Sequence, residues 1–388
     1  MSIRIFRDGS WHFLNQQKVW KTDQWLTIAP HHKLRFNDQW YSIGSDANEL
    51  SSCGWNNYAQ LGQDDTVNRS SLTLLTGPDQ WSILASDGFF TLGISRGRLF
   101  GWGSNADGCL GLGDYEDRAV PAQIGGENDW TAVAAGRNHA LGIRNGQLYA
   151  WGKANSALGL NEITSTNIPT RVGSYNDWTA VAAGAYHSLA IRNGELYAWG
   201  YNECSDSLGL ENVDRQNSPA RVGSFDDWSQ VFASDYSSMA IRNGELYAWG
   251  LNCHGNLGTG DTWNRRVPTR IMTPGNWQFA APGRTHSLGI CDDRLYAWGE
   301  TGLREHGVQT APVCVGTDDD WRKAAVGDAH SLAIRDGKLY GWGRNIFGNL
   351  GVEDRSEHED LTLLNDNAYW LDVFAGNQCT FSIAEKID

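Results

Sequence analysis

RNGELYAWG, residues 192–200, is the stretch that decides the fold, because the chain repeats it. It recurs unchanged at 242–250 and as RNGQLYAWG at 144–152. Looser copies are SRGRLFGWG at 95–103, DDRLYAWG at 292–299, RDGKLYGWG at 335–343 and ANELSSCG at 47–54. From Cys53 in the first copy to Trp342 in the last, the tryptophan position returns every 44 to 50 residues. A fixed period near 50 residues indicates a repeat array or a propeller.

Each repeat carries the pattern of four short β-strands. In residues 178–222 these are WTAVAAG, HSLAI, ELYAWG and, after a longer loop, PARV. Apolar residues alternate with small or polar ones, as half-buried strands require. Asn193-Gly194 predicts a two-residue type I′ hairpin turn, which needs positive φ at both positions. We therefore expect an all-β fold in which each repeat is one antiparallel propeller blade, because a closed ring protects the strand edges.

Tryptophan marks each repeat twice, and the chain has 19 of them. A second tryptophan precedes the first strand of every repeat, at Trp81, Trp130, Trp178, Trp228, Trp277, Trp321 and Trp370. Thirteen tryptophans therefore occupy repeat positions. We interpret them as blade-to-blade packing residues rather than as a cofactor or light-sensing site.

Composition excludes several classes of protein. The formal net charge is −14, and no Lys/Arg-rich run occurs, so we expect neither nucleic-acid binding nor membrane insertion. The sequence begins without a signal-peptide pattern and has no apolar stretch of 18 residues, so we expect a chain made in the cytoplasm. The seven cysteines follow no disulfide or zinc spacing, and we expect reduced thiols.

The order of the motifs resembles the regulator of chromosome condensation repeat family. LYAWG is followed by N-x-x-G-x-LG, as in NCHGNLG at 252–258, then by P-x-x-V and by VAAG-x-x-HSLAI. The resemblance covers roughly residues 41–384 in about seven copies, and it implies a seven-bladed β-propeller. The repeat at 277–315 departs from the pattern, because ETGLREHGVQTAP has lost N-x-x-G-x-LG.

The two ends leave the number of blades open. The last repeat, WLDVFAGNQCTFSIAEKID, supplies only two strands, so the N-terminus must supply the others. RDGSWHFL at 7–14 imitates RNGELYAW, and we expect it to close the ring. Seven blades are favoured, with residues 1–40 as hairpins and 41–388 as the propeller; eight are possible if Trp25 opens a full unit. Ring closure or attachment is the role expected of Trp11, Trp20 and Trp25.

The N-terminal stretch also resembles short tryptophan-punctuated hairpins of some bacteriophage virion proteins. The shared features are DGSW at 8–11 and the spacing of Trp20 and Trp25. This resemblance implies a virion part, with residues 1–40 attaching it to the particle. A local hairpin that closes the ring is the alternative interpretation, and the two are compatible.

Catalytic motifs are weak, and we expect no catalytic residue, cofactor or metal site. Ser95 matches GxSxG but falls on a predicted hairpin, whereas a nucleophile elbow needs a strand-to-helix turn. His139, His187, His286 and His330 recur at one position of the repeat. We expect each imidazole to bond to neighbouring backbone rather than to converge on a metal.

One loop of each repeat varies, which is typical of a binding element on a repeated scaffold. It follows x-LG and carries aromatic residues among carboxylates. The candidate partner-binding residues are Asp64, Asp65, Asp114, Tyr115, Glu116, Asp117, Asp261 and Trp263. A solvated rim without a partner is the alternative interpretation.

These observations favour a non-enzymatic binding or structural module. The most specific version is a bacteriophage virion component, such as a decoration, tail or host-adhesion protein, whose partners are other virion proteins or a host surface component. The alternative is a cytosolic regulator such as a small-GTPase exchange factor, since some members of the resembled family exchange nucleotide on Ran. A UV-B receptor is disfavoured, because the GWRHT motif of that relative is absent.

Overall fold

The computed structural model describes residues 48–386 with their side chains, except 154–155, 162–163, 203–205 and 274. Of residues 1–47 it describes the backbone of six short strands. The chain divides into two compact units, Met1–Asn48 with Glu385–Asp388, and Glu49–Ala384. Each unit has a β architecture of its own.

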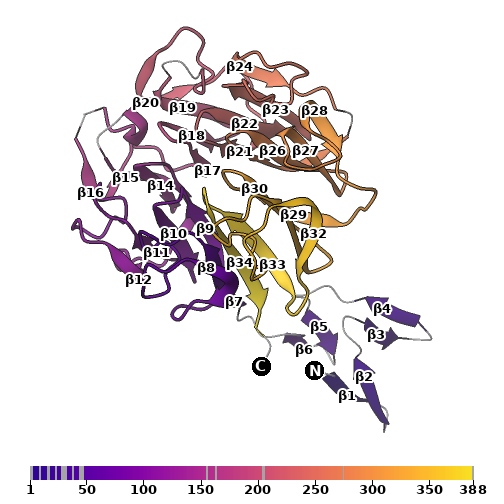
Figure 1. Ribbon diagram of the computed structural model, residues 1–388. Helices are drawn as coiled ribbons and strands as arrows, with labels where there is room; N and C mark the ends of the chain where they lie inside the picture. The colour runs from indigo at the N-terminus through magenta and orange to yellow at the C-terminus, as the bar shows by residue number, and fades with distance from the viewer. Residues whose placement is uncertain are drawn as a thin grey trace. The chain divides into compact units, whose positions relative to one another are not determined.

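The larger unit is a ring of seven four-stranded antiparallel sheets, here blades 1 to 7 (Figure 1). Blade 1 consists of β9 Trp81–Ser86, β10 Phe90–Ser95, β11 Arg98–Gly103 and β12 Arg118–Gln123. Blade 2 consists of β13 Trp130–Ala135, β14 His139–Arg144, β15 Gln147–Gly152 and β16 Thr166–Arg171. Blade 3 consists of β17 Trp178–Ala183, β18 His187–Arg192, β19 Glu195–Tyr201 and β20 Arg215–Arg221. Blade 4 consists of β21 Trp228–Ala233, β22 Ser237–Arg242, β23 Glu245–Gly250 and β24 Arg265–Arg270.

Blade 5 consists of β25 Trp277–Pro282, β26 His286–Cys291, β27 Arg294–Glu300 and β28 Val308–Cys314. Blade 6 consists of β29 Trp321–Val326, β30 His330–Arg335, β31 Lys338–Gly343 and β32 His358–Asn365. Blade 7 combines β33 Trp370–Ala375 and β34 Cys379–Glu385 with β7 Asn48–Gly54 and β8 Arg69–Leu74. The first strands of successive blades contact one another all the way round, including β33 with β9. The prediction of seven blades is therefore confirmed.

The prediction that N- and C-terminal strands together close the ring is confirmed, but the N-terminal segment that takes part is not the predicted one. The strands that complete the C-terminal blade are β7 and β8, and Figure 1 shows β34 beside β7. Residues 7–14 do not take this place, because β2 (Ser10–Leu14) pairs with β1 (Ile3–Arg7) in a sheet of its own. The prediction that RDGSWHFL closes the ring is wrong, since ANELSSCG at 47–54 supplies the third strand of the blade.

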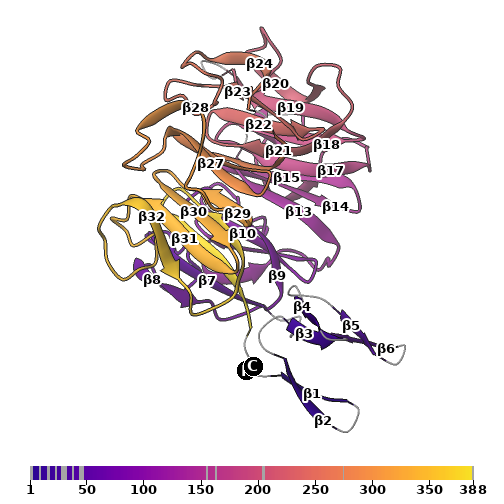
Figure 2. The ribbon, with the colours of Figure 1, turned by 90° about the vertical axis from the view of Figure 1, so that its right-hand side faces the viewer.

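The strands described in the smaller unit form three hairpins. They are β1–β2, β3 (Lys18–Lys21) with β4 (Gln24–Thr27), and β5 (Lys33–Phe36) with β6 (Gln39–Ser42) (Figure 2). The second residue of the returning strand is tryptophan in all three, namely Trp11, Trp25 and Trp40, facing Phe6, Trp20 and Arg35 in the pairing. These hairpins share one register, so the unit is itself a short repeat.

The hairpin turns of the blades follow the sequence prediction. Asn193 and Gly194 have φ of 48° and 73°, the left-handed values that a type I′ turn requires. The β18–β19 pairing runs from His187–Gly200 to Arg192–Glu195, which leaves these two residues as the turn. Ser95 ends β10 at the equivalent hairpin, where its hydroxyl donates to the carbonyl of Asp79. It is therefore not placed as a nucleophile elbow.

The tryptophans at both repeat positions are buried between blades, as predicted. Those of the third strands are fully enclosed, and each indole Nε1 donates at 2.7–2.8 Å to a loop carbonyl of the preceding blade. In blade 3, for example, Trp199 donates to Ala157. At the closing blade Cys53 stands in this position, with its Sγ 3.6 Å from the carbonyl of Asn349.

The recurring histidines join neighbouring blades through side chains, so the predicted bond to backbone is wrong. His139 Nε2 lies 3.0 Å from Ser188 Oγ of the next blade, and His187 Nε2 lies 2.9 Å from Ser238 Oγ. His286 and His330 pair in the same way with Ser331 and Thr380. Burial lowers the pKa of these four imidazoles, to about 4, 3, 4 and 3 in chain order, so they are neutral in the ring.

A belt of backbone hydrogen bonds runs around the outside of the ring. In every blade an N–H of the loop after the third strand donates to the outermost strand of the next blade. The seven donor–acceptor pairs are Asp64–Ala119, Gly113–Asn167, Asn161–Asn217, Glu211–Arg266, Gly260–Thr310, Arg304–Glu359 and Glu353–Ser70. The last pair joins blade 6 to blade 7, so the belt closes on itself. Asp64 has a φ of 62°, so it serves the belt through its backbone conformation.

Candidate functional site

One face of the ring collects the loops that join first to second strands and third to fourth strands. Because strands alternate in direction within an antiparallel blade, both sets of loops emerge on the same side. We call this side the loop face. It contains the predicted partner-binding loops, the mouth of the ring axis and most of the variation between repeats.

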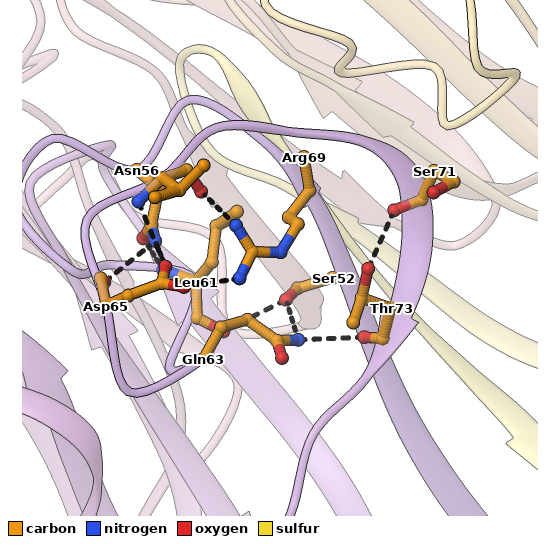
Figure 3. Close-up of polar contacts among 9 residues, drawn as sticks. Ser52, Asn56, Leu61, Gln63, Asp65, Arg69, Ser71 and Thr73 are labelled. Atoms are coloured by element: carbon orange, nitrogen blue, oxygen red, sulfur yellow. Dashed lines mark hydrogen bonds and ion pairs between the residues drawn. The ribbon is translucent and has the colours of Figure 1, made fainter.

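The variable loops of blades 1, 4, 6 and 7 are each organised by an internal cluster of an asparagine, an aspartate and a basic residue, shown for blade 7 in Figure 3. Asn56 Nδ2 donates to the backbone carbonyl of Asp65 at 2.9 Å, while Asn56 Oδ1 accepts the N–H of Leu61 at 2.9 Å. Arg69 donates to the Asp65 carboxylate at 2.5 Å and to the carbonyl of Val67 at 2.8 Å. Nearby, Gln63 bridges Ser52 and the carbonyl of Thr73, and Ser52 donates to the carbonyl of Leu61 (Figure 3).

The same cluster recurs in other blades. Its members are Asn105, Asp114 and Arg118; Asn252, Asp261 and Arg265; and Asn345, Asp354 and His358. The hydrogen bond from Arg265 lowers the pKa of Asp261, and the Glu116 N–H and Arg118 lower that of Asp114. These carboxylates are therefore ionised and already bonded within their own loops.

This organisation divides the predicted partner-binding residues into two groups. Asp65, Asp114 and Asp261 hold their loops together, and Asp117 accepts the N–H of Asn105 at 2.7 Å. Trp263 and Tyr115, by contrast, are 75% and 55% exposed. Glu116 is exposed as well, and Asp64 contributes the backbone bond of the belt. The two aromatic residues and Glu116 are thus the members of the set whose side chains are available to a partner.

An aromatic cluster on the loop face was not predicted from the sequence. Trp55, Tyr58, Phe89 and Phe347 come from blades 7, 1 and 6, with ring centroids 5.2–6.2 Å apart. Tyr58 is 40% exposed and the adjoining Ile346 is 44% exposed. We call these five residues the aromatic cluster. A second aromatic pair, Tyr186 and Tyr236, spans blades 3 and 4 at a centroid distance of 6.2 Å.

The ring axis opens on this face into a cavity of about 110 Å³, here the axial cavity. It is lined by the ends of the innermost strands and by the loops that follow them. Its charged lining residues are Asp87, Asp235, Arg284 and Asp328. A small adjoining cavity shares Asp328 and Asn377 with it and is also lined by Ile346 and Phe347, so the axial cavity borders the aromatic cluster.

The described residues offer no metal centre, because no three His, Cys, Asp or Glu side chains among them gather closely enough to hold an ion. The described cysteines, Cys53, Cys109, Cys253, Cys291, Cys314 and Cys379, are free thiols. The helix content of the described chain is the three-residue η1 (Ser156–Leu158), and none of its helices could span a membrane.

Comparisons with known proteins agree with this architecture. Yeast RCC1 (Prp20) bound to Kap60 is similar with a TM-score of 0.79 at 21% identity, over 88% of this chain and 90% of that one. Prp20p from Saccharomyces cerevisiae, described with its binding properties to Gsp1p and histones, gives 0.79 at 22% identity, over 88% and 92%. Human WBSCR16 gives 0.78 at 22% identity, over 88% and 100%.

At this level of identity the solved structures establish a shared fold. Comparison with curated protein sequences finds no match. The profile of the RCC1-like domain matches residues 117–382, which is well over half of the chain and includes five whole blades. Together with the seven-bladed ring, this match shows that the chain belongs to the RCC1-like domain family.

Proposed function

We propose that this protein is a non-enzymatic regulator that binds a protein partner through the loop face of its propeller. The observation that carries the proposal is the aromatic cluster, in which Tyr58 and Ile346 are exposed beside a charged cavity. Exposed aromatic anchors with a polar surround are typical of the centres of protein–protein interfaces. The internally paired carboxylates of the variable loops supply a rigid rim around this centre.

A small GTPase is the first partner class to test. Support comes from the family membership and from yeast Prp20p, whose binding to Gsp1p has been described. The blades are even in length, so an exchange activity would have to use the loop face rather than a long inserted wedge. The test is release of a fluorescent guanine nucleotide from small GTPases of the source organism.

Incorporation into a bacteriophage particle remains a prediction, motivated by the tryptophan-bearing hairpins at the N-terminus. Mass spectrometry of density-banded particles against the soluble fraction of the source culture separates the two possibilities. Recovery of the chain in particles at stoichiometric copy number would favour a virion role, and its restriction to the soluble fraction would favour the regulator.

The proposal itself is tested by partner capture with matched variants. The double variant Tyr58→Ala/Ile346→Ala removes the exposed part of the aromatic cluster. Its control, Ile168→Ala/Val267→Ala, removes two exposed apolar side chains from the outermost strands of blades 2 and 4. A partner on the loop face should be lost with the first variant and kept with the second. Equal retention by both variants would refute the proposed surface.

A further inference from the structure

The loops around the axial cavity carry charges that differ from blade to blade. The position two residues before the start of the second strand differs most. In blades 1 to 7 it holds Gly88, Arg137, Ala185, Asp235, Arg284, Asp328 and Asn377. Asp87 occupies the preceding position, where the other blades have Gly136, Gly184, Ser234, Gly283, Gly327 and Gly376. Blade 1 therefore places a carboxylate where its neighbours leave space.

Two of the three carboxylates of this cavity, those of Asp87 and Asp235, have no direct partner among the described residues. Within the described part of the chain, no hydrogen bond or ion pair reaches the carboxylate oxygens of Asp87 or Asp235, whereas Asp328 lies 3.9 Å from Arg284. Burial raises the pKa of Asp87 well above its usual value, the nearby Asp235 raises it further, and Arg137 offsets part of the effect. The ionised form of Asp87 is thus short of positive charge.

The charged side chains that line the cavity are mostly negative. It contributes three carboxylates and one guanidinium, because Arg137 lies outside it. A cation therefore suits the axial cavity better than an anion. The carboxylates do not gather closely enough to coordinate a metal ion. An ammonium group fits this arrangement, since it is held by charge and by three rotatable N–H donors rather than by a tight ligand shell.

The volume of the axial cavity also suits an alkylammonium group. A single water needs roughly 10–15 Å³ of such space, so about 110 Å³ accommodates the end of an alkylammonium chain. The small side chains of Ala183, Gly184 and Gly376 line the wall and leave the centre open. The mouth lies beside the aromatic cluster, so a side chain that enters the cavity would extend from a partner seated on the loop face.

We propose that the axial cavity binds an alkylammonium group, of the kind that a lysine side chain of the protein partner presents. The identification of the ligand as a partner's lysine rests on the proposed function, whereas binding of a free alkylammonium ion does not. Asp87, Asp235 and Asp328 surround the ammonium head, whereas Arg284 in the lining and Arg137 outside it oppose the cation and limit its affinity.

The experiment is isothermal titration calorimetry of the full chain with n-butylammonium chloride, with n-butanol as the neutral isostere and calcium chloride as the metal probe. Asp87→Ser copies Ser234 of blade 4, and Asp328→Asn copies Asn377 of blade 7, so both variants use residues that this fold already holds at those positions. Asp360→Asn, on the exposed outer strand β32, removes the same charge elsewhere and serves as the control.

We expect millimolar binding of butylammonium to the parent chain and to Asp360→Asn, at least fivefold weaker binding to Asp87→Ser and Asp328→Asn, and no binding of butanol. Burial raises the pKa of Asp87 and of Asp235, so affinity should rise with increasing pH as these two groups ionise between Asp328, Arg137 and Arg284. Absence of binding to the parent chain, equal binding of butanol, unchanged affinity in Asp87→Ser, or calcium binding that displaces butylammonium would overturn the proposal. If butylammonium binds but no protein partner depends on the loop face, the proposed function fails while the cation site stands.

Discussion

The four histidines between blades make the ring sensitive to acid. His139, His187, His286 and His330 are at most 2% exposed, and burial depresses each folded-state pKa to between about 3 and 4. In the unfolded chain a histidine has a pKa near 6.5. Between these two pKa values the four histidines are protonated in the unfolded chain and neutral in the folded ring. The stabilisation is complete above pH 6.5 and is lost as the pH falls from there towards 4.

The size of the effect follows from this difference. At pH 5 an unfolded histidine with a pKa of about 6.5 gains roughly 2 kcal/mol from protonation, and a folded one with a pKa of 3–4 gains almost nothing. Four such residues lower the free energy of unfolding by about 8 kcal/mol between pH 7.5 and pH 5. Since single domains are stable by about 5–15 kcal/mol, we expect acid unfolding near pH 5.

The chain supplies its own control for this prediction. Blade 1 has Phe90 at the histidine position, and the hydroxyl position of blade 2 is Ala140. The double variant His187→Phe/Ser238→Ala copies this apolar pair into the interface between blades 3 and 4. Urea unfolding followed by tryptophan fluorescence at pH 7.5, 6 and 5 should show a loss that is smaller by about 2 kcal/mol at pH 5 than in the parent. His254→Gln, at a surface histidine bonded to Glu300, should leave the loss unchanged.

A loss of stability in the double variant as large as that of the parent would refute the reasoning. It would show that His187 is not a neutral group in the folded ring. Histidine C2-proton titrations of the native protein provide the second check, because a buried imidazole that titrates near pH 6.5 contradicts the depressed pKa directly.

Three further predictions follow from the ring and its loops. Removal of residues 1–47 should leave the melting temperature of the propeller unchanged in calorimetry, because β7 and β8 close the ring, and a sharp drop would contradict this closure. Asn105→Ala should lower the free energy of unfolding by about 1–3 kcal/mol in urea titrations, because it leaves the buried Leu110 N–H without its acceptor. Its control, Asn57→Ala at an exposed position, should change the free energy of unfolding little. Cys53 and Cys379 should resist thiol reagents in the native protein while exposed Cys253 reacts, because burial excludes the reagent and raises the pKa of Cys379 to about 12; rapid labelling of all three would show that the closing blade opens.

The fold could be predicted because the blade is a local unit repeated with a fixed period. Each hairpin turn, such as Asn193-Gly194, is fixed by residues next to each other in the sequence. Closure could not be read in the same way. ANELSSCG has lost its tryptophan to Cys53, so the intact-looking RDGSWHFL was the better sequence match, although the geometry of the ring selects β7.

The candidate site depends on contacts between blades, which the repeat does not reveal. The variable loops were identified from their sequence variation, but the pairing of Asp114 with Arg118 and Asn105 shows that their charge serves the loop itself. The aromatic cluster joins Trp55 to Phe347, almost the whole ring apart in sequence. The axial charges meet only when seven equivalent positions are brought to one axis. Aligning the repeats and reading down the column after the first strand would have found them.

The belt of backbone hydrogen bonds and the composite blade 7 also set an order in time. The two outer strands of that blade are synthesised first, and its two inner strands emerge roughly 300 residues later. At about 5–20 residues per second the ribosome needs on the order of 15–60 s for that interval. During it β7 and β8 can pair with each other, but β7 lacks its inner partner strand β34. The ring that brings Glu353 of blade 6 to Ser70 of blade 7 is also not yet closed. The ring therefore closes only after β33 and β34 have been made, and these two strands complete the sheet that β7 and β8 begin.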